Sequence, residues 1–292
     1  MTDTAAAVKV GRSRSRAWGG PGLARYARAL RSARGLIGLV TLATLVGAAV
    51  AAPLIFPGGY DEQSRGSLAS ATTGHPFGTD ELGRDILTRA IYGLRVDLSL
   101  LFTAVPLSMV IGTVLGLSGA LSQRLGSGTQ RLLDVIDGFP SLILGLCVVA
   151  IMGPGWLPLF ITIAISGIPS IGRYARASWL AQQNREYVVA AQVLGVSRWR
   201  ILIRHVLPNA MDGILVQGAV LMVVGVYIEA GLSIVGLGVV PPTPSLGVLL
   251  NSGLRFVTES PVYVVGPALI LLLLTLAFSF VADALNDAVN ER

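Results

Sequence analysis

Six long apolar runs constrain this chain more than any other feature of its sequence. They cover Leu36–Phe56, Leu98–Leu121, Leu132–Met152, Trp156–Ile171, Gly213–Leu237 and Val262–Ala282. A helix needs about 20 apolar residues to cross the ~30 Å core of a bilayer. Five runs reach that length, and we expect the short fourth run to extend toward Ala177. Because the runs are continuous and do not alternate as barrel strands do, they predict an all-α integral membrane protein with six transmembrane helices.

The composition agrees with a membrane protein and excludes a soluble one. Charged residues make up 13% of the chain and hydrophobic residues 53%, whereas a soluble domain has roughly 25% charged residues. The only lysine, Lys9, is followed by Val10, so the chain has no Gly-Lys-Ser/Thr run of the kind that binds nucleotide phosphates. Any ATP hydrolysis is therefore expected on another subunit.

The distribution of basic residues predicts the orientation. With the N-terminus in the cytoplasm, 17 of the 22 basic residues fall in inside segments and 5 in outside segments, which is the asymmetry of the positive-inside rule. The predicted organisation is a basic cytoplasmic tail over 1–34, a six-span domain over 35–285 and a cytoplasmic tail over 286–292. Within the domain, 57–95 is an outer loop and 182–208 an inner loop.

The basic tail has two possible partners. Residues 1–22 are rich in Arg, Ser, Gly and Ala, and Arg25–Arg34 reads as a short interfacial helix. Trp18 and Tyr26 are the only aromatic residues among the arginines, so we favour contact with anionic membrane lipid and expect no nucleic acid partner.

The long inner connection predicts two short helices joined by a tight corner. Gly195 can adopt the left-handed conformation that ends a helix, and Ser197 can cap the next one. Pro208 is expected to end the second helix, because the residue before a proline is displaced from the helical region. Ala190 and Ala191 leave a bare surface on the first helix that another protein could approach. A DNA-binding helix-turn-helix and a plain amphipathic connector are the competing interpretations.

This inner connection resembles the "EAA" loop of ABC importer permeases. Ala190-Ala191, Gly195 and Leu207-Pro208 have its spacing, and the loop precedes the penultimate span as in that family. The resemblance implies a coupling helix that docks into a cytoplasmic ATPase. The sequence departs from the motif at Val189, which stands at the acidic position; Glu186 lies three residues earlier. The implied coupling residues are Glu186, Ala190, Ala191, Gly195, Ser197, Leu207 and Pro208.

A second stretch, His75–Gly93, resembles the signature of the C-type permease of dipeptide and oligopeptide importers. Its signature residues are Gly78, Thr79, Asp80, Gly83, Arg84 and Asp85. From the residues alone, Thr79 could cap a helix, with Asp85 near the start of that helix. A structured outer loop and a direct role in substrate contact both remain open. His75 has no neighbour at metal-ligand spacing, so no metal site is expected.

A third stretch, Glu229–Gly247, resembles the end of span five and its outer loop in the same family. The candidate gate or vestibule residues are Glu229, Gly236, Gly238, Pro241, Pro242 and Pro244. The prolines cannot extend a helix, so a stiff loop is expected after Gly238. Glu229 could fix the bundle by pairing with a basic residue or capping a helix, or it could line the outer vestibule.

Two further features belong to the spans themselves. Asp134 and Asp137 are intramembrane acidic residues near the inner end of the third run. The spacing of Gly112 and Gly116 predicts close approach of two helices.

Together these resemblances imply a type I ABC importer permease, a non-catalytic subunit of an ATP-driven importer of di- and oligopeptides in the bacterial inner membrane. The implied partners are a second, homologous permease, cytoplasmic ATPases that hold ATP and Mg, and an external peptide-binding protein. This chain would carry no cofactor. The same architecture could carry nickel chelates or another small solute. A channel or proton-coupled carrier is the alternative of a different class, since such proteins hold several ionisable residues within their spans.

Overall fold

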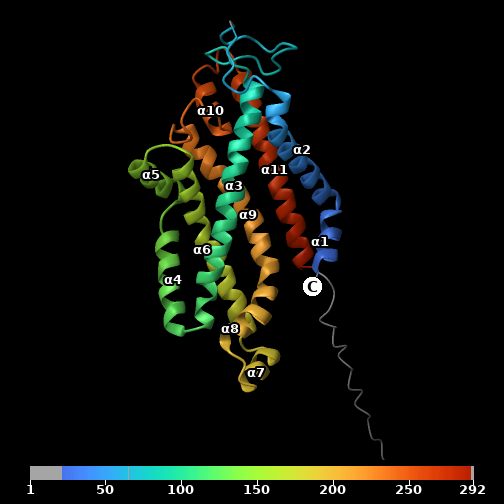
Figure 1. The fold of residues 1–292 in the computed structure, drawn as a ribbon, viewed down its shortest axis with the longest axis vertical. Coiled ribbons are helices and arrows are strands. Elements are labelled where there is room, and N and C mark those ends of the chain that lie inside the picture. Colours follow the sequence, from blue (N-terminus) through green and yellow to red (C-terminus); the bar gives the residue numbers. More distant parts are fainter. Residues whose placement is uncertain (1–21, 65, 291–292) are drawn as a thin grey trace, which may run out of the picture.

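The computed structural model describes residues 22–64 and 66–290, and this part of the chain is helical (Figure 1). Among the described residues, the only extended pairings are two isolated bridges, Gln63 with Arg84 and Thr79 with Asp85. Residues 1–21 of the predicted basic tail, Arg65, and residues 291–292 lie outside the described residues. The elements in order are α1 (Gly22–Leu30), α2 (Ala33–Ile55), α3 (Ile86–Leu117), a 3-10 turn (Ser118–Ala120), α4 (Gln123–Asp137), α5 (Ser141–Met152), α6 (Trp156–Gln182), α7 (Glu186–Val193), α8 (Arg198–Ile201), a π turn (Leu202–Val206), α9 (Leu207–Ile234), α10 (Leu246–Leu254) and α11 (Val262–Asn290).

In the described part of the chain, five helices are long and apolar enough to cross a membrane. They are Ala33–Ile55, Ile86–Ala120, Trp156–Gln182, Arg198–Ile234 and Val262–Asn290. The protein is therefore a multi-pass membrane protein. The second of these helices begins well before the predicted Leu98, so residues 86–95 of the predicted outer loop are helical. The cause is local, because the Asp85 side chain accepts a hydrogen bond from the Thr88 N–H at 2.7 Å and starts the helix there.

The third apolar run is not the single straight span that we predicted. It is divided between α4 and α5, which meet at an angle of 86°. Gly138 ends α4 and Pro140 begins α5. Proline has no N–H to continue a helical ladder and displaces the preceding residue from the helical region, which explains the break. The chain has six spans only if this bent pair counts as one.

Glycines bring α3 and α6 together, as the sequence predicts. A Cβ added at Gly112 would lie 2.8 Å from the Ile168 carbonyl oxygen, and one at Gly116 would lie 2.1 Å from the Gly172 carbonyl oxygen. Neither position can hold a side chain without separating the helices. The two long helices thus form a rigid centre, with α9 and α11 beside them (Figure 1).

The ends of the bundle differ in structure. The loop before α3 covers one end, and α7 and α8 project from the other, while the end of α11 lies beside α1 (Figure 1). Helix α1 covers most of the predicted interfacial helix. Its Arg25 donates to Asp212 of α9 at 2.6 Å, and the Tyr26 hydroxyl also donates to Asp212. The hydrogen bond from Arg25 to Asp212 raises the pKa of Arg25 above its ordinary value. It also joins the N-terminal helix to α9.

Candidate functional site

The corner between α7 and α8 has the conformation that the sequence predicts. Gly195 has a φ of +75°, in the left-handed region. Ser197 precedes α8 with extended backbone, and its hydroxyl accepts a hydrogen bond from the Arg200 N–H at 3.4 Å. A glycine stop followed by a serine cap therefore fixes the direction of α8 relative to α7.

The prediction that Pro208 ends the second helix is wrong. A continuous helical path runs from Arg198 to Ile234, and Pro208 lies in the first turn of α9. The π turn just before it widens the ladder, and proline is tolerated where its missing N–H has no partner to lose. The Asn209 side-chain amide donates to the His205 carbonyl oxygen at 2.6 Å and satisfies it at this irregular turn. The inner loop is thus joined directly to a membrane-crossing helix.

Helix α7 exposes an apolar surface at the tip of the molecule. Val193 is 82% exposed and Leu194 81%, while Val188 is fully buried and attaches the helix to the core. Ala190 is exposed and Ala191 is partly buried. Exposed apolar groups of this size next to small side chains are typical of a protein docking surface.

The remaining predicted coupling residues lie around α7. Glu186 and Pro208 line one cavity of about 850 Å³ between α7 and the π turn, together with Asn184, Arg185, Tyr187, Arg204, His205 and Asn209. Leu207 is half-buried, and Val189 is 45% exposed. Burial raises the pKa of Tyr187. The structure therefore brings Glu186 and Pro208 together, and it leaves Val189 free to contact a partner.

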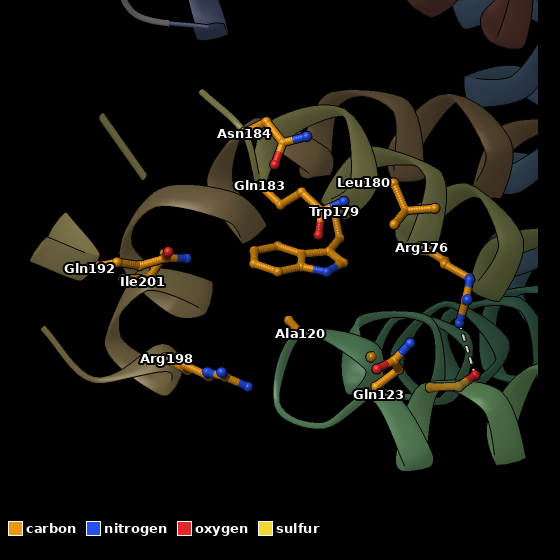
Figure 2. A pocket seen from close by; sticks show the side chains of 12 residues that line it. Ala120, Gln123, Arg176, Trp179, Leu180, Gln183, Asn184, Gln192, Arg198 and Ile201 are labelled. Atoms are coloured by element: carbon orange, nitrogen blue, oxygen red, sulfur yellow. Dashed lines mark hydrogen bonds between the residues drawn. The ribbon is translucent and has the colours of Figure 1, made fainter. Parts of the chain in front are cut away.

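A second cavity, of about 490 Å³, lies between the inner loop and the start of α4 (Figure 2). Trp179 of α6 lies at its centre, between Gln192 and Ile201 on one side and Ala120 on the other (Figure 2). Arg176 donates to the Gly126 carbonyl oxygen at 2.8 Å and joins α6 to α4. This cavity lies beside the inner loop, and sequence reasoning did not find it.

The outer signature residues gather around one buried carboxylate. Asp80 is fully buried and accepts from the Arg84 Nε at 2.7 Å, and the Arg89 Nε lies 3.5 Å away. Arg84 also contacts Asp61 at 3.1 Å. Burial alone would lower the pKa of Arg84, but its hydrogen bonds to Asp80 and Asp61 raise it above the ordinary value. Such a paired network is a structural scaffold.

Two glycines make this outer network possible. Gly78 and Gly83 have positive φ values of +75° and +76°, and an added Cβ would lie 2.3 Å from the Ala69 and Ser64 carbonyl oxygens, respectively. The predicted cap at Thr79 is wrong. The Thr79 hydroxyl instead donates to the Gly66 carbonyl oxygen at 2.6 Å and holds the loop, while Asp85 caps α3.

Sequence reasoning missed several members of this outer network, among them Asp61. Arg89 lies on the first turn of α3 and is 3% exposed. The Tyr263 hydroxyl donates to Glu81 at 2.9 Å and ties the loop to α11. No local pattern marks Tyr263, because its partner is distant in the sequence. Because Asp80, Arg84 and Glu81 have partners within the protein, the loop fits the scaffold interpretation rather than direct contact with a substrate.

The candidate gate residues lie in three places: the turn after α9, the proline loop that follows it, and α9 itself. Gly236 has a φ of +86°, and a Cβ on Gly238 would lie 2.1 Å from the Ser233 Oγ, so both glycines shape the turn after α9. The loop that holds Pro241, Pro242 and Pro244 follows this turn, as predicted. Glu229 is only 2% exposed, so it does not line an open vestibule in this structure.

The two acidic residues of the third run share one basic partner. Asp137 forms an ion pair with Arg173 of α6, and Asp134 lies 3.7 Å from the same guanidinium. All three side chains are about half exposed. The ion pair places a positive charge beside the carboxyl end of α4, where the helix dipole alone would oppose a carboxylate.

Comparison with known proteins gives one family. The model of the family described as "Binding-protein-dependent transport system inner membrane component" matches residues 108–292. A dipeptide transport system permease protein DppC of Alkalihalophilus pseudofirmus is 34% identical over 84% of this chain and 81% of its own length. A di/tripeptide transport system permease protein DppC of Pseudomonas aeruginosa is 36% identical over 85% of this chain and 84% of its own length.

A solved structure shares the fold. A chain of the MetNI methionine ABC transporter, in an inward-facing conformation, aligns with 68% of this chain and 95% of its own length. The TM-score is 0.56 and the sequence identity is 18%. The helical arrangement is thus that of a type I ABC importer permease.

Proposed function

Because this chain belongs to the family of binding-protein-dependent transport system inner membrane components, we propose that it is a membrane-spanning subunit of an ATP-driven importer of short peptides. The observation that carries the proposal is the α7 corner, where Gly195 and Ser197 fix a short helix with an exposed apolar surface. The curated relatives with dipeptide and di/tripeptide names support the substrate class.

Helix α7 would act as the coupling helix. A cytoplasmic ATPase would receive Val193, Leu194 and the bare surface at Ala190, and Glu186 would supply the acidic group near the position that Val189 occupies. Because the path from Arg198 to Ile234 is continuous, a displacement of α7 would be passed directly to a membrane-crossing helix.

The proposed topology follows from this assignment. Residues 1–34, 182–208 and 286–292 would lie in the cytoplasm of the bacterial cell and the loop before α3 outside its inner membrane, in agreement with the 17-to-5 distribution of basic residues. The loops around Asp80 and after Gly238 would then face an external peptide-binding protein. A homologous permease would complete the solute path.

Affinity purification tests the assignment most simply. The tagged chain should retain a second permease and one or two ATPases, and cells that lack it should resist toxic peptide mimics. Cells that stay fully sensitive to those mimics and lose nickel-dependent enzyme activity would contradict peptide import. A chain that purifies without any ATPase would contradict the ABC assignment.

A further inference from the structure

Two buried carboxyl groups meet at the start of α10, where no proposed transport step uses them. Asp97 of α3 is 3% exposed and Glu229 of α9 is 2% exposed. Asp97 Oδ2 accepts a hydrogen bond from the Leu246 N–H at 3.1 Å, and Glu229 Oε1 accepts one from the Ser233 hydroxyl at 2.7 Å. The three helices α3, α9 and α10 pack against one another and supply these two side chains and the Leu246 N–H.

Each carboxyl group keeps one oxygen without a partner. Asp97 Oδ1 and Glu229 Oε2 are buried and have no hydrogen-bond partner among the described residues. In the described part of the chain, no Arg, Lys or His forms an ion pair with either residue. Buried charges in proteins are paired or neutralised, so a buried carboxylate oxygen without a donor requires a proton, an ion or a water as its partner.

The groups around the two carboxyls determine which charge would balance them. Among the described residues, the charged group that acts on Asp97 is Glu229, and the other groups that face the pair are the Ser233 and Ser245 hydroxyls and the Leu246 N–H. The N-terminus of α10 compensates for part of one negative charge. The second negative charge stays uncompensated, so the pair lacks one positive charge.

The chemistry of the site favours a small monovalent cation. All its acceptors are oxygen atoms, and the described residues contain no cluster of three His, Cys, Asp or Glu that could hold a metal ion. A divalent ion takes about six oxygen ligands or more, which two carboxyls and two hydroxyls do not supply. A peptide ammonium group has no open route to the site, because both carboxyls are enclosed.

We propose that Asp97 and Glu229 form a monovalent cation site that is filled by a proton or by Na⁺. The cation would take the two unpartnered oxygens, Asp97 Oδ1 and Glu229 Oε2, as its ligands and would hold α3 and α9 together at the start of α10. Loss of the cation would leave two like charges side by side and would separate these helices on the outer half of the bundle. The site is independent of which solute the protein carries.

The test uses the purified full-length protein with its partner subunits. Thermal unfolding is measured with Na⁺ or choline at constant ionic strength, and infrared spectra record the carbonyl band of protonated carboxyl groups. If Na⁺ is the occupant, saturation at 100 times Kd raises the unfolding temperature by about 5–10 °C. If a proton is the occupant, unfolding is insensitive to Na⁺ and the protonated-carboxyl band is present.

The matched variants are isosteric amides. The double variant Asp97→Asn/Glu229→Gln needs no cation, so it should fold and lose both the Na⁺ effect and the band. Glu259→Gln, which removes an exposed carboxyl of the outer region, should keep the parent behaviour. Either single amide variant replaces the double variant if that one is poorly expressed. The proposal is overturned if the parent shows neither response, or if the parent response persists in the amide variants.

Discussion

Replacement of Gly195 by valine isolates the conformation of the α7 corner from its packing. Gly195 has a φ of +75°, and a Cβ added there would meet no atom within 4 Å. The cost of the substitution is therefore conformational and not steric. A non-glycine residue held in the left-handed region costs roughly 1–3 kcal/mol, and a β-branched one lies at the upper end. That cost corresponds to about a 5- to 150-fold change in the equilibrium between the native conformation of the corner and other conformations.

We expect Gly195→Val to uncouple transport from ATP hydrolysis. The corner would relax to a negative φ and turn α7 away from its docking direction. Stimulation of ATPase activity by the peptide-loaded binding protein, and peptide uptake into proteoliposomes, should fall together. The protein should still assemble, because Gly195 packs against no neighbour.

Two control variants make this test specific. Asparagine tolerates the left-handed region better than other side chains, so Gly195→Asn should keep most of the coupling. Gly153 has a φ of +80° and equally open surroundings, but it lies between α5 and α6, so Gly153→Val should leave coupling intact. Equal coupling in Gly195→Val and the parent, or equal loss in the valine and asparagine variants, would refute the reasoning.

Three other predictions follow from the structure. Val193→Asp, which places a charge on a side chain that is 82% exposed, should reduce retention of the ATPase in affinity purification by about tenfold or more without affecting thermal unfolding; full retention would exclude α7 as the docking surface. Asp80→Ala removes the one buried carboxylate that two buried guanidinium groups share and should cost about 3–5 kcal/mol in unfolding free energy. Asp61→Ala, at a partner carboxylate that is 54% exposed, should cost less than about 1 kcal/mol, and equal costs would contradict the scaffold interpretation. In a chain without Cys147, cysteines are introduced at Ser67 or at Asn286, both exposed. An impermeant maleimide on intact cells should label the cysteine at 67 and not the one at 286. Labelling of the cysteine at 286 alone would show that the topology is the opposite of the one proposed.

The features that sequence predicts well are those with a local cause. Continuous apolar runs specify membrane-crossing helices because lipid requires the backbone to bond within each segment. The Gly195 and Ser197 corner depends only on backbone preference and one capping hydrogen bond. Pro140 is itself a local signal for a break in the helix. We nevertheless predicted one span, because the apolar run continues on both sides of it.

The features that sequence did not predict depend on contacts between distant segments. Asp97 and Glu229 lie on different helices, and α10 brings them together. Arg173 joins Asp134 and Asp137 only because α4 packs against α6. The π turn before Pro208 lets the helix continue although proline has no N–H. The rule that a proline ends the preceding helix therefore did not apply here.

The central claim is that this chain is a membrane-spanning subunit that forms part of the path for ATP-driven peptide import. The most direct measurement is accumulation of a labelled dipeptide in proteoliposomes that contain the full complex, with the binding protein on the outside and ATP enclosed. We predict accumulation that requires ATP and that is lost when this subunit is omitted. Accumulation driven by a proton gradient without ATP, or ATP-dependent import of another solute but not of dipeptides, would contradict the account.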